Sequence, residues 1–409
     1  MTCLPTPSTP DSPSTSSTER RARLLRTIGY YAAFVSLGLA SASLGPTLPG
    51  LAEHTGSRLS DISALFVARS LGYLAGSLLG GRLYDRRPGH PVMGAGLLLM
   101  AGMMGLAPLL PRLWALAAAI LVLGMAEGVL DVGGNTLLVW VHGDRVGPCM
   151  SGLHFFFGLG AFLSPVIIAR AMLGAGGMAL AYWTLAALLL PAALWLFPLS
   201  SPLGPKVSAS EPATPTNARL VALMVALFFL YTGAEIAFGG WIYSYAVALG
   251  LSSHAGAAYL TSAFWGAFTA GRLLSVPLAT RFRPRFVLIA DFLGCLVSLA
   301  ILLVGSNSLA VTFLGTCGAG LSMASIFPAA LCLAQGRMRI TGQVTGWFLV
   351  GASAGGMVLP WLIGQFFETA GPRATMVILL IDMTAAVGIL AVLTFQSARP
   401  VYQRIIGER

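Results

Sequence analysis

The sequence predicts an all-α membrane protein of about twelve transmembrane helices, arranged as two pseudo-symmetric six-helix bundles around a central cavity. Three observations predict this fold class. Of 409 residues, 56% are hydrophobic and only 9% are charged, whereas soluble domains are about 25% charged. Apolar stretches of about 20 residues, long enough to cross a bilayer, follow one another along the chain. A polar stretch rich in Pro and Ser, 200–217, divides them into two sets of six.

The elements follow in order from these apolar stretches and the polar connections between them. The predicted spans are 25–49, 60–83, 91–110, 113–141, 149–171 and 178–199, then 218–249, 255–280, 285–306, 308–335, 343–368 and 373–396. The domains are a disordered cytoplasmic tail (1–24), an N-terminal six-helix bundle (25–199), a cytoplasmic linker (200–217), a C-terminal six-helix bundle (218–396) and a cytoplasmic tail (397–409).

Basic residues gather in one set of connections. They lie before span 1, after spans 2, 4, 8 and 10, and in the linker, whereas the opposite connections hold Arg58, Arg112, Arg170 and Arg373. The positive-inside rule then predicts an integral cell (inner) membrane protein with both termini in the cytoplasm. Since topology accounts for the net charge of +10, no nucleic-acid partner is expected.

The two halves repeat at an offset of 195 residues. Gly76 of span 2 corresponds to Gly271 of span 8, and Pro165 of span 5 to Pro360 of span 11. Parallel repeats that enclose a midplane cavity are typical of alternating-access transporters.

Three polar residues lie one helical turn apart in the fourth span. Glu127, Asp131 and Asn135 are spaced i, i+4, i+8 and therefore share one helix face. An ionised carboxylate at bilayer depth costs about 2.5–3.5 kcal/mol, which makes a functional role the default interpretation. Two such acids repel each other unless one holds a proton or a cation lies between them. The face therefore predicts a cation-coupling site of Asp131, Glu127, Asn135 and Thr136, with sodium at Asp131 and a proton both left open. No other metal or cofactor is expected.

The connection after span 2 carries a recognisable motif. Gly81-Arg-Leu-Tyr-Asp85-Arg86-Arg87-Pro-Gly89-His90 resembles the signature loop of the major facilitator superfamily. The resemblance implies a gating loop of Gly81, Asp85, Arg86 and Arg87 that latches the cytoplasmic helix ends in the outward-facing state.

Spans 4 and 5 resemble a particular branch of that superfamily. The stretches 131–136 and 153–165 resemble the sodium-dependent glucose transporter-like branch. More distantly, the pattern Asp131-x-x-x-Asn135 in span 4 resembles the bacterial fucose permeases, which are sugar–proton symporters. The resemblance to the permeases implies that Asp131 serves both protonation and sugar contact, and that His154 falls near the position of their span-5 glutamine, a sugar ligand. The second essential acid of the permeases lies in span 1, where this chain has no carboxylate, and this absence shifts weight to Glu127.

The remaining candidates for substrate binding are polar or aromatic side chains on cavity-side spans. Arg69, in the middle of span 2, is expected to pair with Glu127 or Glu235 or to contact substrate, and Glu235 is expected to line the outer gate or to pair with Arg69. Sugars need hydrogen-bonding groups and an aromatic face. The candidates of these kinds are Asn135, His154, Trp241, Tyr245, Trp265, Trp347 and Gln365. Arg272, in span 8, is expected to anchor packing.

The sequence predicts a transporter and not an enzyme, since no catalytic pattern is found. The function expected is cation-coupled symport of a monosaccharide such as glucose by alternating access, with sodium or a proton as the coupling ion. The expected partners are this small molecule and the lipid bilayer, and the expected assembly is a monomer. A drug–proton antiporter and a lipid or glycolipid flippase of the same fold remain open alternatives.

Overall fold

The computed structural model describes residues 13–174, 176–202, 204, 217–305, 307–338 and 340–395. Within these residues the chain forms helices and turns, and no strand. This confirms the predicted all-α class. The segments 1–12, most of the predicted linker and the predicted C-terminal tail lie outside the described residues.

The described residues of the first half form eight α-helices. They are α1 (Pro13–Ser41), α2 (Leu44–Thr55), α3 (Leu59–Ile62), α4 (Ala64–Arg86), α5 (Gly89–Leu106), α6 (Leu113–His142), α7 (Val146–Leu173) and α8 (Gly177–Leu196). Short 3-10 helices follow α5 (Ala107–Leu109) and α6 (Gly143–Arg145).

In the part of the second half that the structure describes there are seven α-helices. They are α9 (Ala218–Ala248), α10 (His254–Arg281), α11 (Pro284–Val304), α12 (Leu309–Met323), α13 (Ile326–Gln335), α14 (Gly342–Phe367) and α15 (Ala374–Phe395). Across the described residues, eleven helical stretches are long and apolar enough to cross a membrane. The 28-residue helix α10 is more polar than these stretches, because it carries Arg272 and several Ser, Thr and His side chains.

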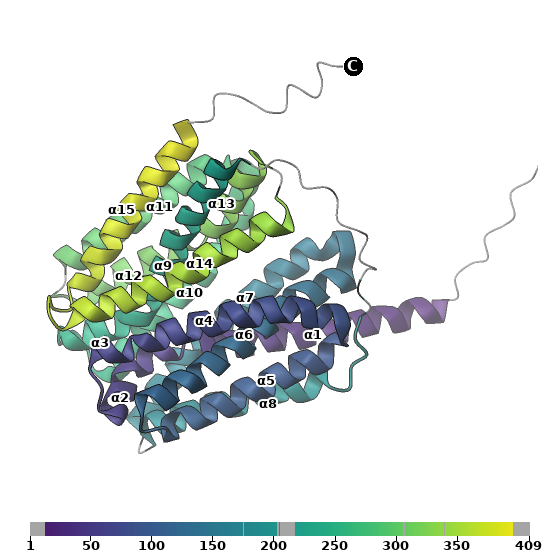
Figure 1. Ribbon diagram of the computed structural model, residues 1–409, viewed down its shortest axis with the longest axis horizontal. Helices are drawn as coiled ribbons and strands as arrows, with labels where there is room; N and C mark the ends of the chain where they lie inside the picture. Colours follow the sequence, from purple (N-terminus) through teal and green to yellow (C-terminus); the bar gives the residue numbers. More distant parts are fainter. Residues whose placement is uncertain are drawn as a thin grey trace, which may run out of the picture.

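The helices form two groups, α1–α8 and α9–α15 (Figure 1). We call the end that holds α2 and α3 the distal end, and the end beside Gly204 and Ala218 the linker end. The groups lie close together at the distal end and diverge toward the linker end (Figure 1). Among the described residues, the hydrogen bonds that join the two groups also lie at the distal end. Gln365 Nε2 donates to the Ser60 carbonyl (3.0 Å) and to Ser63 Oγ (3.3 Å), Leu59 N–H donates to Glu368 Oε1 (3.0 Å), and Tyr243 contacts Met172 Sδ (3.8 Å).

The predicted disordered tail is wrong for residues 13–24, which are helical. The end of this segment, Arg20-Arg-Ala-Arg-Leu24, consists of residues that favour helix, and Glu19 pairs with Arg23 one turn later at 3.9 Å. Helix α1 therefore begins well before the predicted span.

Three spans predicted to be continuous are broken. The first breaks between α1 and α2, the second at Ser63, and the tenth between α12 and α13. A serine hydroxyl lies at each break: Ser43 Oγ donates to the Ala40 carbonyl (2.8 Å), Ser63 Oγ to the Ser60 carbonyl (2.6 Å) and Ser325 Oγ to Asp291 Oδ2 (2.6 Å). Side-chain hydrogen bonds of this kind compete with the helical ladder and allow the chain to turn inside the membrane region.

Helices α4 and α6 cross at backbone contact distance. Gly72 and Gly76 on α4 face Gly124 and Gly128 on α6, and a Cβ atom at any of the four would overlap the backbone of the other helix. Small residues spaced by four allow such an approach. The crossing places Arg69 and Tyr73 of α4 opposite residues 127 and 131 of α6.

Candidate functional site

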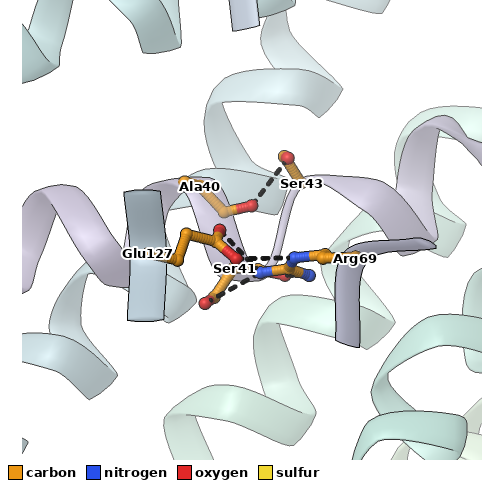
Figure 2. A network of polar contacts seen from close by, with 5 residues as sticks. All are labelled: Ala40, Ser41, Ser43, Arg69 and Glu127. Carbon is orange, nitrogen blue, oxygen red and sulfur yellow. Dashed lines mark hydrogen bonds and ion pairs between the residues drawn. The ribbon is translucent and has the colours of Figure 1, made fainter. Parts of the chain in front are cut away.

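Arg69 and Glu127 form a two-point ion pair between α4 and α6 (Figure 2). Arg69 Nε donates to Glu127 Oε2 at 2.9 Å, and Nη2 donates to Oε1 at 2.8 Å. The Glu127 side chain is 2% exposed and that of Arg69 is 16% exposed. Of the two partners expected for Arg69, the structure has Glu127. The charge of Glu127 is thus already balanced within the protein.

Arg69 also holds the break in the first span. Its Nη1 donates to the Ser41 carbonyl at 2.8 Å and its Nη2 to Ser41 Oγ at 2.9 Å (Figure 2). The carbonyl groups at the C-terminus of α1 lack intrahelical partners and carry partial negative charge, which a guanidinium group satisfies. One arginine therefore connects α1, α4 and α6.

Asp131 has different partners. Tyr73 donates its hydroxyl to Asp131 Oδ2 at 2.7 Å, and Asn135 Nδ2 donates to the Asp131 carbonyl (2.9 Å) and to Oδ1 (3.2 Å). These donors are neutral, and in the described part of the chain Asp131 forms no ion pair. Its side chain is partly exposed, as are Asn135 and Thr136. Of the two acids on this face, Asp131 is the one without a cationic partner among the described residues.

His154 lies on α7 at the level of Asp131. The Phe34 ring meets the His154 ring edge-on with centroids 6.0 Å apart, and the same Phe34 ring packs against Gly134 of α6. His154 is half-buried, and none of its described contacts is a hydrogen bond. Phe34 thus connects His154 with the helical turn of α6 that follows Asp131.

Arg272, which the sequence predicts only as a packing anchor, belongs to the same region. It lies on α10, half-buried, with its guanidinium 4.5 Å from the Phe268 ring centroid, and forms no ion pair with any described residue. Its charge interacts electrostatically with Asp131 and His154 of the first half and with Glu235 of the second. A single arginine within the apolar span 8 was the available signal.

Glu235 lies on α9 and is half-buried. Its neighbours are Arg272 and Tyr231, whose hydroxyl donates to the Met323 carbonyl at 3.1 Å. Glu235 is not the partner of Arg69. Asp131 and Glu235 thus lie in different halves of the protein, with Arg272 within electrostatic reach of both.

Several predicted substrate ligands lie away from this region. Trp241 is fully buried, donates its indole N–H to the Pro360 carbonyl at 2.9 Å and packs against Phe367. Tyr245 is also fully buried and donates to the Leu302 carbonyl at 2.9 Å. Both side chains form interior contacts in this conformation.

The remaining aromatic and amide candidates occupy three different places. Trp265 is 7% exposed, and its indole N–H has no partner among the described residues. It meets Phe157 of the other half edge-on, with ring centroids 6.3 Å apart, and therefore lies at the interface between the two halves. Trp347 is 53% exposed and lines a groove of about 790 Å³ between α9 and α14. Gln365 forms the distal hydrogen bonds given above.

The gating-loop residues are free at the linker end. Asp85, Arg86 and Arg87 are exposed, and none of them forms an ion pair or a side-chain hydrogen bond with a described residue. A Cβ atom at Gly81 would meet open space. This is consistent with the divergence of the two groups there.

Comparison with known proteins identifies a family, two similar relatives and a solved structure of the same fold. A model of the Major Facilitator Superfamily matches residues 30–360. The chain is 33% identical to sodium-dependent glucose transporter 1 of Xenopus laevis, over 80% of this chain and 72% of the relative. It is 32% identical to sodium-dependent glucose transporter 1A of Mus musculus, over 82% and 88%. The crystal structure of a mutant of the nucleoside transporter NupG shares the fold, with a TM-score of 0.74 at 14% identity, over 92% of this chain and 100% of that one.

Proposed function

Since the chain belongs to the major facilitator superfamily, and is a transporter and not an enzyme, we propose that it couples the entry of sodium or a proton to the uptake of a monosaccharide such as glucose. The observation that carries this proposal is the unequal state of two neighbouring acids. Glu127 is neutralised by Arg69, whereas Asp131 is held by the neutral donors Tyr73 and Asn135. Carboxylates within membrane spans mark ion and proton pathways, and Asp131, held only by neutral donors, is the acid that would bind the coupling cation.

The side chains near Asp131 supply ligands for either coupling ion. The described residues contain no group of three or more His, Cys, Asp or Glu side chains suited to a tightly bound metal. Oxygen atoms of Asp131, Asn135 and Thr136 suit a weakly bound monovalent ion, and Asp131 alone suits a proton. Weak, reversible binding is what a transport cycle requires.

The choice of a sugar is supported by the names of the relatives and by the groups at the interface between the two halves. The relatives from frog and mouse are named as glucose transporters. Trp265 offers an aromatic face with a free N–H, while His154 and Asn135 offer hydrogen-bonding groups for hydroxyls. Trp241 and Tyr245 would join the substrate site only in a conformation in which the distal end is open.

The transport cycle would alternate between closure at the distal end and closure at the linker end. In the conformation described, the distal end is joined by Gln365 and Glu368 while the gating loop at the linker end is free. With the linker end in the cytoplasm, as the distribution of Lys and Arg predicts, this is an inward-facing state. A cation at Asp131 would neutralise the carboxylate and lower the cost of enclosing it.

The test is uptake of labelled monosaccharides into proteoliposomes under an imposed sodium or proton gradient. Wild type should accumulate sugar, and Asp131→Asn should lose accumulation while retaining part of its sugar exchange. The matched control is Asp291→Asn, which removes an acid that Ser325 binds on α11, away from the proposed site. If wild type moves no sugar under either gradient, the sugar proposal is wrong, and apolar cations and lipids become the substrates to test.

A further inference from the structure

Among the described residues, five Asp, Glu and Arg side chains lie near the interface between the two halves within the membrane region, beside the imidazole of His154. Arg69 and Glu127 balance each other in a direct ion pair. The other three are Asp131, Glu235 and Arg272, and none of these forms an ion pair with a described residue. With all three ionised, one cation faces two carboxylates and the set has a net charge of about −1.

The helix packing places Arg272 at the level of His154 in one half and near Glu235 in the other. Helices α7 and α10 run in opposite directions in contact, because Gly158 meets Thr269 and Phe162 meets Gly266. Arg272 follows Thr269 by three residues, so it lies at the level of His154, which is four residues before Gly158 on α7. On the other side, Phe238 of α9 packs against Phe264 of α10. Glu235 is therefore about one turn from Arg272 along the axis, within reach of a long side chain.

The contacts of Arg272 leave its charge available. Its guanidinium rests on the Phe268 ring at 4.5 Å, a contact that keeps the group in place without neutralising it. An arginine in a membrane span is costly without an anionic partner. Two carboxylates compete for this role, one on each half of the protein.

We propose that Arg272 is the internal counter-ion shared by Asp131 and Glu235, and that the remaining negative charge makes closure of the cavity require one monovalent cation per cycle. This inference rests on the proposed function and adds to it a charge-balance residue and a stoichiometry. When Arg272 pairs with Glu235, Asp131 is left for the coupling cation. The enclosed set then has no net charge, and this is the state that can be closed at lowest cost.

Charge balance predicts a distinct result for each of three variants. Arg272→Gln leaves two unbalanced carboxylates, so one bound cation no longer neutralises the set, and cation-driven uptake should fall about tenfold or more. Glu235→Gln leaves Arg272 free to neutralise Asp131, so sugar should equilibrate without a cation and should not accumulate. The double variant Arg272→Gln/Glu235→Gln again needs one cation, and should recover cation-driven uptake to within about threefold of wild type.

The experiment measures sugar uptake, sugar exchange and the ratio of cation to sugar in proteoliposomes, for wild type and these variants. Arg272→Lys keeps the charge and should retain coupled uptake. Arg285→Gln is the matched control, because Arg285 also rests on a phenylalanine ring at 4.5 Å but is exposed at the start of α11. Size-exclusion profiles establish that each variant is folded.

Three results would overturn the inference while leaving the proposed symport intact. The first is a double variant that is folded but as inactive as Arg272→Gln, which would point to direct substrate contact by Arg272. The second is full coupling in Glu235→Gln, and the third is a ratio other than one cation per sugar in wild type. Absence of gradient-driven uptake in wild type would instead reject the proposed function itself.

Discussion

Arg69 and Glu127 lie opposite each other on α4 and α6, 58 residues apart in sequence, and Tyr73 and Asp131 repeat the same relationship one turn further along. Each pair joins residue i on α4 to residue i+58 on α6. The first pair is an ion pair whose two charges balance each other. In the second pair, the carboxylate is bound only by neutral donors. Two adjacent turns of one helix crossing therefore provide a structural contact and a candidate coupling site.

The ion pair of Arg69 and Glu127 should contribute strongly to the stability of the protein. Arg69→Ala leaves Glu127 buried without a counter-ion and frees the Ser41 carbonyl, so the free energy of unfolding should fall by about 3–5 kcal/mol. Arg69→Met combined with Glu127→Leu removes both charges and should restore much of that loss. Thermal unfolding in detergent measures both variants, with the exposed Arg285→Ala as the control. An unchanged melting temperature for Arg69→Ala would show that the pair does not hold α4 to α6.

The second pair should tune the affinity for the coupling ion. Tyr73→Phe removes a donor that stabilises the free carboxylate of Asp131, a contribution of about 1 kcal/mol. The apparent affinity for the cation should therefore rise about fivefold. Tyr84→Phe is the matched control, because Tyr84 on the same helix donates to the Val129 carbonyl at 3.1 Å. Uptake measured against cation concentration gives the affinity, and a fall in Tyr73→Phe would indicate that the hydroxyl is itself a ligand.

The helices and their order could be predicted because an apolar stretch of membrane length is a local property of the chain. The predicted span 113–141 and the observed α6, Leu113–His142, differ by one residue. The breaks could not be predicted in the same way, because they depend on partners from elsewhere. The turn after Ser41 is held by Arg69 of α4. Ser325, at the break between α12 and α13, donates to Asp291 of α11.

The candidate site was predictable to a similar extent. The spacing of Glu127, Asp131 and Asn135 is enough to place them on one helix face. Which of the two acids is neutralised depends on the register of α4 against α6, which no single helix encodes. Arg272 was assigned to packing because its relation to Asp131 and Glu235 arises only when the two halves come together.

The distal hydrogen bonds should favour the conformation in which that end is closed. Gln365→Ala removes the bonds to Ser60 and Ser63, and each is worth about 1 kcal/mol, or about a fivefold change in population. A cysteine at Thr136, in a background without reactive native cysteines, should then react faster with an impermeant reagent applied at the distal side. Glu53→Gln is the control, since Glu53 is exposed on α2 near the same end. Equal labelling rates would exclude Gln365 as part of a latch.

The close crossing of α4 and α6 is what aligns both residue pairs, and it should not tolerate a side chain. A Cβ atom at Gly76 would overlap the Met125 backbone, so Gly76→Val must push the two helices apart. We expect the yield of monodisperse protein to fall about tenfold or more, and sugar uptake with it. Gly102→Val on α5 is the matched control, because it adds the same β-branched residue to a helix at an exposed glycine with open space around its Cβ position. If Gly76→Val is folded and retains symport, the alignment of Arg69 with Glu127 and of Tyr73 with Asp131 does not depend on this glycine contact.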